Sequence, residues 1–199
     1  GFNKIASFEI DKDASATIEK KFKNSIHIKD DITQVTNNKL SKIFGKKKID
    51  IICGGPPCQG FSVAGYRNPN DKRNLLFREY LRFLKFFKPK IFMLENVPGI
   101  LTLSDGNVKN IMMNEFEKLG YNNTSVRILE SANFEVPQMR TRAIFIGNRL
   151  GKKNPYPKII NTKENYLNIE DYIDDLKNHP RDPSINHEWT KHSEKFEKR

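Results

Sequence analysis

The 199-residue sequence has little of what a disulfide-stapled, metal-held or membrane-spanning protein requires. It contains two cysteines, Cys53 and Cys58, which are too few for a disulfide framework. Its four histidines are spread along the chain and do not form the ligand set of a structural zinc site. No apolar run approaches the ~20 residues of a membrane-spanning helix, and the first residues lack the apolar segment of a signal peptide. These absences exclude a membrane protein, predict no metal site, and favour a reducing, cytoplasmic compartment.

Hydrophobic residues make up 37% of the chain, with 14 Phe and 6 Tyr, which is enough to bury the core of one domain. The formal net charge is +11. Residues 1–149 hold 25 basic and 15 acidic residues, whereas residues 150–199 hold 10 and 9, so the basic excess lies in the first part. Such an excess suits a polyanionic partner, nucleic acid above all. A lysine-rich solvated surface is the alternative, and composition alone does not decide between them.

Short β-like runs alternate with helical patterns over residues 1–149. Apolar runs predict strands at residues 4–10, 25–28, 49–53, 91–94, 124–129 and 143–147. Helical spacing predicts helices at residues 13–22, 33–44, 74–87 and 108–119. This alternation predicts an α/β fold with a doubly wound, mostly parallel sheet. Residues 150–199 are polar and punctuated by proline, with one helix expected at 169–177, which is typical of a linker or the entrance to another domain.

Ligands of such sheets bind at the carboxyl ends of the strands. Three segments follow predicted strands directly: residues 9–11, 54–62 and 95–99. We expect the strands that end at Ile10, Cys53 and Leu94 to lie side by side and parallel. Glu9, Cys58 and Glu95 would then converge on one edge of the sheet.

The loop Gly54-Gly55-Pro56-Pro57-Cys58 is the first candidate for chemistry. Two glycines end the strand and two prolines stiffen the backbone before Cys58, which would hold a thiol at a fixed place on the ligand edge as a nucleophile. A turn filled by a small apolar side chain is the alternative. Cys53 lies inside the apolar run, and we expect it to be a buried structural residue.

Two further segments place charged side chains next to strands. Glu95 follows the run at residues 91–94, where partial burial suits a carboxyl group to share or donate a proton, although a turn cap would use the same residue type. Arg140 and Arg142 alternate in an extended segment, which places two guanidinium groups on one side, as recognition of a phosphate or carbonyl group requires.

The order of these segments resembles the signature motifs of the DNA (cytosine-5) methyltransferases. The motifs that carry the resemblance are Pro57-Cys58-Gln59, Glu95-Asn96-Val97, Gln138-x-Arg140-x-Arg142, Phe8-Glu9-Ile10-Asp11, Asp30-Asp31-Ile32-Thr33 and Asn74-Leu75-Leu76-Phe77. They cover roughly residues 1–148. The resemblance implies the Rossmann-like fold of class I S-adenosylmethionine-dependent methyltransferases.

The resemblance also implies a reaction, the methylation of C5 of a cytosine that is flipped out of double-stranded DNA. Cys58 would add to C6 of the base as the nucleophile. Glu95 would contact N3 and the exocyclic amine, and Arg142 would hold the O2 side. Arg140 would help to position the base or a nearby phosphate, and Asn96 would shape the loop.

For the cofactor S-adenosylmethionine, the resemblance implies two polar contacts and an apolar lining. Glu9 would bind the ribose hydroxyls and Asp31 the adenine amine. Ile10 and Ile32 would pack on the adenine faces. Pro56 and Leu76 would lie nearby.

The sequence departs from the family at both ends. The family opens with a Phe-x-Gly-x-Gly-Gly loop around the methionine end of the cofactor, and it closes with a target-recognition domain and further motifs, none of which occurs here. We therefore expect residues 1–149 to be a catalytic core that lacks the glycine loop, and residues 150–199 to lead into a missing target-recognition domain. The fold would be incomplete at both ends. The chain would be a monomer, or a complementing fragment if the gene is split.

The expected setting is a restriction–modification system, and two alternatives stay open. One is a tRNA cytosine-5 methyltransferase of the same fold, although Gln59-Gly60-Phe61-Ser62 resembles the DNA enzymes more. The other is a catalytically silent nucleic-acid-binding module. Intact Cys58, Glu95 and Arg142 argue against that second alternative.

Overall fold

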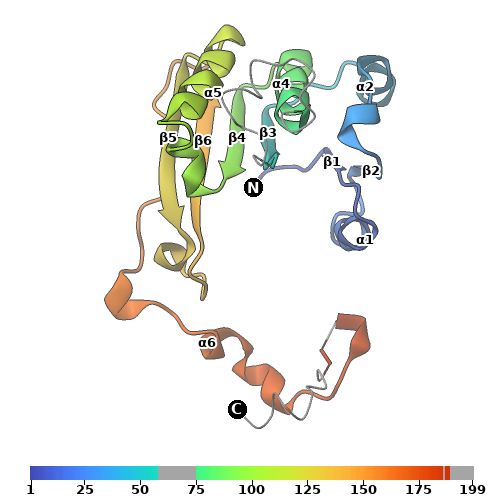
Figure 1. Cartoon of the computed structure of the whole chain (residues 1–199). Helices are drawn as coiled ribbons and strands as arrows, with labels where there is room; N and C mark the ends of the chain where they lie inside the picture. The colour runs from blue at the N-terminus through green and yellow to red at the C-terminus, as the bar shows by residue number, and fades with distance from the viewer. Residues whose placement is uncertain (58–74, 186, 189–199) are drawn as a thin grey trace. The chain divides into compact units, whose positions relative to one another are not determined.

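A computed structural model of the chain describes residues 1–57, 75–185, 187 and 188 (Figure 1). The chain divides into two compact units. The first comprises residues 1–130 and 141–158, and the second comprises residues 131–140 and 159–199. The predicted division into a catalytic core, residues 1–149, and a segment that leads into a target-recognition domain, residues 150–199, concerns function. It stays a prediction.

The first unit contains two sheets. A two-stranded sheet pairs β1 (Ala6–Phe8) with β2 (Ile26–Ile28) in parallel. A four-stranded sheet has the order β3-β4-β6-β5. Its strands are β3 (Ile51–Gly54), β4 (Ile91–Asn96), β5 (Asn123–Glu130) and β6 (Thr141–Asn148). Strand β6 is antiparallel to both of its neighbours, so β3, β4 and β5 share one direction and the predicted α/β class with a mostly parallel sheet is confirmed.

The predicted row of three neighbouring strands is only partly right. Strands β3 and β4 are parallel neighbours as expected, but in the described part of the chain β1 pairs with β2 and not with β3. Side chains join the two sheets instead: Phe8 and Ile52 pack in one apolar cluster with Phe44 and Phe83. An apolar run predicts that a segment is a strand, but the choice of neighbour depends on long-range pairing that the run does not encode.

The first helices along the chain begin at side-chain caps. Helix α1 (Lys12–Lys21) begins after Asp11, whose carboxylate accepts a hydrogen bond from the Ala14 amide at 2.8 Å. The helix expected at residues 33–44 is instead a 3-10 turn, η1 (Ile32–Gln34), followed by α2 (Asn37–Phe44). Asp31 caps the first and Thr36 caps the second, and these two separate caps break the segment in two.

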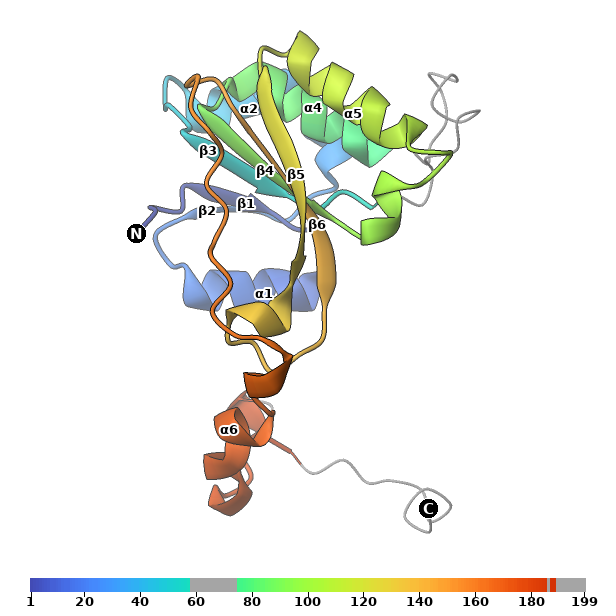
Figure 2. The ribbon, with the colours of Figure 1, turned by 90° about the vertical axis from the view of Figure 1, so that its left-hand side faces the viewer.

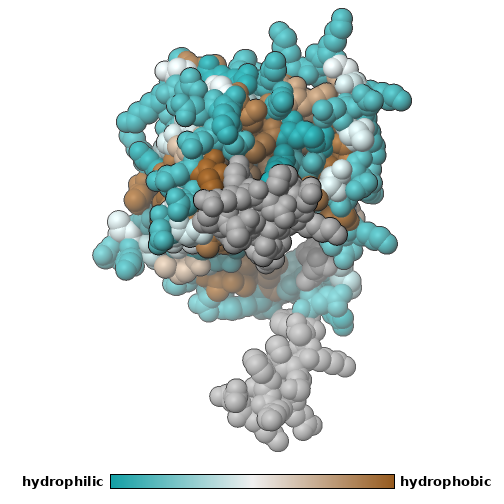
Figure 3. All heavy atoms as spheres, turned by 45° about the horizontal axis from the view of Figure 1, so that its top comes forward, coloured by the Kyte–Doolittle hydropathy of each residue, from teal (hydrophilic) through white to brown (hydrophobic). Residues whose placement is uncertain are grey.

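Helices α4 (Leu75–Phe87) and α5 (Asn107–Lys118) cover one face of the four-stranded sheet, and η3 (Pro98–Leu101) leads from β4 towards α5. Their apolar sides meet β4 and β6 in a core that includes Phe77, Leu84, Phe92, Leu94, Met112, Phe116 and Phe145. Figures 1 and 2 show α1 and α2 on opposite sides of the β1–β2 sheet. Helices therefore lie on both sides of this sheet, as a doubly wound fold requires. The face seen in Figure 3 is mainly hydrophilic, with hydrophobic residues showing between polar side chains.

The second unit consists of short turns. These are η4 (Ser131–Phe134), η5 (Lys163–Asn165), α6 (Glu170–Ile173), η6 (Asp174–Asn178) and η7 (Pro183–Ile185). Asn133 ties two of its segments together, because its carbonyl oxygen accepts from the Ile160 amide at 2.9 Å and its side chain accepts from the Tyr166 hydroxyl at 2.6 Å. The helix expected at 169–177 is present as α6 continued by the 3-10 turn η6. Across the described ranges of both units, no helix is long and apolar enough to cross a membrane.

Candidate active site

The carboxyl ends of β3 and β4 bring two of the predicted motifs together. Gly54 is the register partner of Leu94, so the chain leaving β3 runs beside Glu95 and Asn96. The buried Asn96 side chain donates from Nδ2 to the Pro56 carbonyl oxygen at 3.0 Å. Its Oδ1 accepts from the Val97 amide at 2.9 Å. Asn96 therefore fixes the start of the loop that carries Cys58, while Cys58 itself lies outside the described residues.

Glu95 and Arg142 form an ion pair next to this anchor. Arg142 lies on β6 two residues before Ile144, the register partner of Glu95, so both side chains are on the same face of the sheet. Arg142 Nε lies 2.6 Å from Glu95 Oε1, with 25% and 38% of the two side chains exposed. A carboxylate and a guanidinium side by side present hydrogen-bond acceptors and donors together. Such a pair can read a planar group that offers both complements, as the edge of a base does.

Two glycines allow the close approach of these elements. A Cβ atom on Gly54 would lie 2.8 Å from a ring carbon of Tyr80, and one on Gly55 would lie 3.0 Å from Glu95 Oε2. Tyr80 stands on α4, and its buried hydroxyl donates to the Met93 carbonyl oxygen at 2.9 Å. Burial raises the pKa of Tyr80 well above its usual value, so this hydroxyl remains a donor. No motif indicated Tyr80, whose signal in the sequence is a hydroxyl group within an otherwise apolar helix face.

Two predicted cofactor-binding carboxylates lie at one edge of the two-stranded sheet. Glu9 follows β1, and its Oε1 accepts from the Asp11 amide at 2.9 Å. Asp31 follows β2, and its Oδ1 accepts from the Thr33 amide at 2.9 Å. Hydrogen bonds from Thr33 lower the pKa of Asp31, so the carboxylate is ionised at neutral pH. Because β1 and β2 are parallel neighbours, both carboxylates follow the carboxyl ends of their strands.

The four residues that are expected to line the adenine site differ in how exposed their side chains are. Ile10 is 67% exposed, whereas Ile32, Pro56 and Leu76 are half-buried. The structure thus shows where these four residues lie, and their contact with adenine stays a prediction.

Arg140 belongs to the second unit, where its carbonyl oxygen accepts hydrogen bonds from the Ser131 amide at 3.1 Å and the Ser131 hydroxyl at 3.0 Å. Arg142 belongs to the first unit. The expectation that both guanidinium groups face one side therefore stays a prediction.

The expectation that Cys53 is buried is wrong. Cys53 is exposed. It lies on the same side of the sheet as its register partner Met93, which is also exposed. The run Ile51–Cys53 is uniformly apolar, but side chains alternate along a strand, and Ile52 is the residue that packs into the core. Neighbouring atoms still surround part of the thiol, and this desolvation raises the pKa of Cys53.

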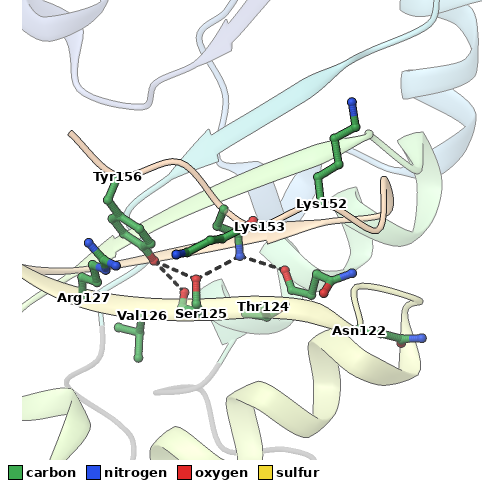
Figure 4. A pocket seen from close by; sticks show the side chains of 10 residues that line it. Asn122, Thr124, Ser125, Val126, Arg127, Lys152, Lys153 and Tyr156 are labelled. Atoms are coloured by element: carbon green, nitrogen blue, oxygen red, sulfur yellow. Dashed lines mark hydrogen bonds between the residues drawn. The ribbon is translucent and has the colours of Figure 1, made fainter. Parts of the chain in front are cut away.

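A separate hollow of about 280 Å³ lies between β5 and residues 152–156 (Figure 4). There the Tyr156 hydroxyl donates to the Ser125 carbonyl oxygen at 2.9 Å, and Asn154 Nδ2 donates to Ser125 Oγ at 2.9 Å. Arg127 stacks over the Tyr156 ring at 4.7 Å. None of the predicted site residues lines this hollow. Its polar groups hydrogen-bond to one another, which indicates that they hold residues 152–156 against β5.

The comparisons with known proteins agree with the motifs. The family described as C-5 cytosine-specific DNA methylase matches residues 1–199. The Type II methyltransferase M1.HphI of Haemophilus parahaemolyticus is 35% identical, over 83% of this chain and 45% of the relative. M.DdeI of Desulfomicrobium norvegicum is 39% identical, over 88% of this chain and 43% of the relative. The chain thus spans less than half the length of these two curated relatives.

A solved structure described as a DNA modification methyltransferase encoded within a prophage (E. coli) is also similar. It has a TM-score of 0.68 and 28% identity, over 87% of this chain and 48% of that chain. Structures at lower identity, such as S. pombe Dnmt2 with a TM-score of 0.55, share the fold. Because the family model matches the full sequence, residues 1–199, the chain belongs to the C-5 cytosine-specific DNA methylase family.

Proposed function

We propose that the protein containing this chain transfers a methyl group from S-adenosylmethionine to C5 of a cytosine flipped out of double-stranded DNA. The observation that carries the proposal is the Glu95–Arg142 pair beside the Pro56 anchor of the Cys58 loop. The names of the relatives, Type II methyltransferases, support DNA as the substrate and a restriction–modification system as the setting. Extrusion of the base is required because C6 and C5 are not accessible within the base stack.

Cys58 is the proposed nucleophile. Its thiolate adds to C6 and forms a Cys58–C6 bond, and the electron pair of the C5–C6 double bond moves into the ring towards C5 and N3. Glu95 stabilises this change through N3 and the exocyclic amine, while Arg142 donates to O2. After methylation, loss of the C5 proton to a base returns the electron pair and expels the Cys58 thiolate.

The residues at the two-stranded sheet fit the cofactor. When bound, S-adenosylmethionine supplies an electrophilic methyl group. Glu9 and Asp31 each use one carboxylate oxygen for a backbone amide, and a carboxylate has the capacity to accept further hydrogen bonds. They therefore suit a ligand with hydroxyl and amine donors, and we assign the ribose to Glu9 and the adenine amine to Asp31.

Covalent trapping of the full-length protein tests the proposal. Duplex DNA made with 5-fluorocytosine in place of every cytosine carries the modified base at any target cytosine it contains, and fluorine at C5 blocks release of the adduct. With S-adenosylmethionine, the wild-type protein should form a denaturant-resistant complex with this DNA. Cys58→Ser should form none, because an alcohol is a far weaker nucleophile than a thiolate.

Cys53→Ser is the matched control, since it makes the same chemical change on the exposed strand position and should trap normally. Trapping that survives Cys58→Ser would contradict the assignment of the nucleophile. Trapping of single-stranded RNA but not of duplex DNA would contradict the substrate.

A further inference from the structure

Helix α4 carries an ion pair that the proposed reaction does not use. Arg82 Nε donates to Glu79 Oε2 at 2.8 Å, and Arg82 Nη2 contacts the same oxygen at 2.5 Å. Only 24% of the Arg82 side chain and 14% of the Glu79 side chain are exposed. Their opposite charges offset each other, so the pair exerts little net field on a distant ligand.

The Arg82 guanidinium also reaches beyond its own helix. Nη2 donates to the carbonyl oxygen of Ile32 at 3.2 Å, and Nη1 donates to Asn37 Oδ1 at 2.7 Å. Ile32 opens η1, and Asn37 is the first residue of α2. One planar group thus ties α4 to two successive segments, with Glu79 fixing its orientation.

The segment held in this way carries Asp31. The Asp31 carboxylate is the cap of η1, so its direction depends on the shape of that turn. The backbone bonds of the turn are Gln34 N to Asp31 O at 2.9 Å and Val35 N to Ile32 O at 3.3 Å. A turn of this size is weakly held by its own hydrogen bonds.

On the side that faces Arg82, the turn is only partly packed. A hollow of about 410 Å³ opens beside the turn, lined in part by Thr33, Thr36, Glu79 and Arg82. Ile32 and Val35 pack the other side of the turn into the apolar cluster, so on the side of the hollow the Arg82 bonds are what restrain it.

We propose that Arg82, oriented by Glu79, is a positioning residue that sets the direction of the Asp31 carboxylate and thereby the discrimination of adenine in the cofactor. This inference rests on the assignment of Asp31 to the adenine amine in the proposed function. It goes further in naming two residues that belong to none of the motifs and that determine how well the purine is read.

The test compares two product analogues as inhibitors of the full-length enzyme. S-adenosylhomocysteine carries the amine that Asp31 would accept from, whereas S-inosylhomocysteine carries an oxygen in its place. One hydrogen bond to a charged group corresponds to about 10- to 100-fold in affinity, so the wild type should prefer the adenosyl compound by at least about 10-fold. Arg82→Lys keeps the charge but loses the planar fork. It should reduce the preference by at least about threefold and raise the KM for S-adenosylmethionine, with kcat nearly unchanged.

Three controls make the result decisive. Asp31→Asn should remove most of the preference, and Lys85→Gln, an exposed change later on α4, should leave it intact. Asn37→Ala removes one acceptor of Arg82 and serves as a second, milder variant if Arg82→Lys does not fold. A purely structural role would lower the melting temperature and weaken both inhibitors equally.

An unchanged preference in folded Arg82→Lys and Asn37→Ala, together with its loss in Asp31→Asn, would overturn the positioning role. If Asp31→Asn keeps the preference, both the adenine assignment and the positioning role fail. Covalent trapping through Cys58 is measured on protein with Asp31 intact, so the proposed reaction is judged separately.

Discussion

The Arg142 guanidinium on β6 holds the Glu95 carboxylate at the end of β4, with Nε and Oε1 2.6 Å apart. The two residues lie far apart in the sequence. They meet because β4 and β6 are hydrogen-bonded neighbours and because both side chains point to the same face. The pairing of β4 with β6 therefore brings the carboxylate and the guanidinium together.

We expect Glu95→Gln to lower the methyl-transfer rate of the full-length enzyme by about 100-fold or more. The variant keeps the shape but loses the carboxyl group that can share a proton with N3 as electron density moves there, and loss of one such group costs on the order of 10²–10³ in rate. Initial rates of labelled methyl incorporation into DNA measure the effect. Glu115→Gln, which breaks an exposed pair with Lys118 on α5, should retain full activity. Equal losses in the two variants would contradict a specific role of Glu95.

The two partners should also act as a unit. In a double-mutant cycle, Glu95→Gln combined with Arg142→Gln should cost less than the sum of the two single changes, because either change alone already breaks the pair. Strict additivity would show that Glu95 and Arg142 contribute independently.

The sequence predicted the class of the fold and the strands that end at the site. It did so because apolar runs are local signals, as at Ile91–Asn96. From the sequence we expected β1 to lie beside β3 and Cys53 to be buried, and both predictions were wrong. Strand neighbours and the open face of a strand are set by contacts between distant segments, such as the packing of Phe8 with Ile52.

The same limit applies to the supporting residues of the site. The motifs indicated Glu95 and Asp31, but Tyr80 and Arg82 carry no motif of their own. Their roles follow only from what they touch: the Met93 carbonyl oxygen and the Ile32 carbonyl oxygen.

Asn96→Ala should reduce both activity and stability. The change leaves the Pro56 carbonyl oxygen without its Asn96 donor and frees the start of the Cys58 loop. A lost hydrogen bond at a buried group costs about 1–3 kcal/mol of unfolding free energy, which urea denaturation of the chain can resolve. We expect kcat of the full-length enzyme to fall by roughly 10-fold, since misplacement of reacting groups is costly. Asn110→Ala, an exposed change on α5, is the control and should alter neither quantity.

Gly54→Ala should destabilise the chain by about 1–3 kcal/mol, the usual cost of overpacking. The added methyl group would lie 2.8 Å from the Tyr80 ring, which is fixed by its hydrogen bond to Met93. Gly99→Ala should be tolerated, because a Cβ there meets no atom within 4 Å. Thermal unfolding of the two variants side by side gives the comparison. A Gly54→Ala protein as stable as Gly99→Ala would show that Tyr80 can move away from the strand.

Cys53 should react slowly with iodoacetamide at neutral pH although it is exposed. Desolvation raises its pKa above the ordinary value of 9.0, so at any pH below that value the thiolate fraction is smaller than in a free cysteine. The alkylation rate at Cys53, followed by peptide mass spectrometry, should therefore rise through the alkaline range and reach half its maximum above pH 9.0. A short unstructured peptide with one cysteine gives the reference curve at lower pH. A plateau for Cys53 below the reference midpoint would mean that neighbouring groups stabilise the thiolate, and Cys53→Ser would then no longer be a neutral control for Cys58→Ser.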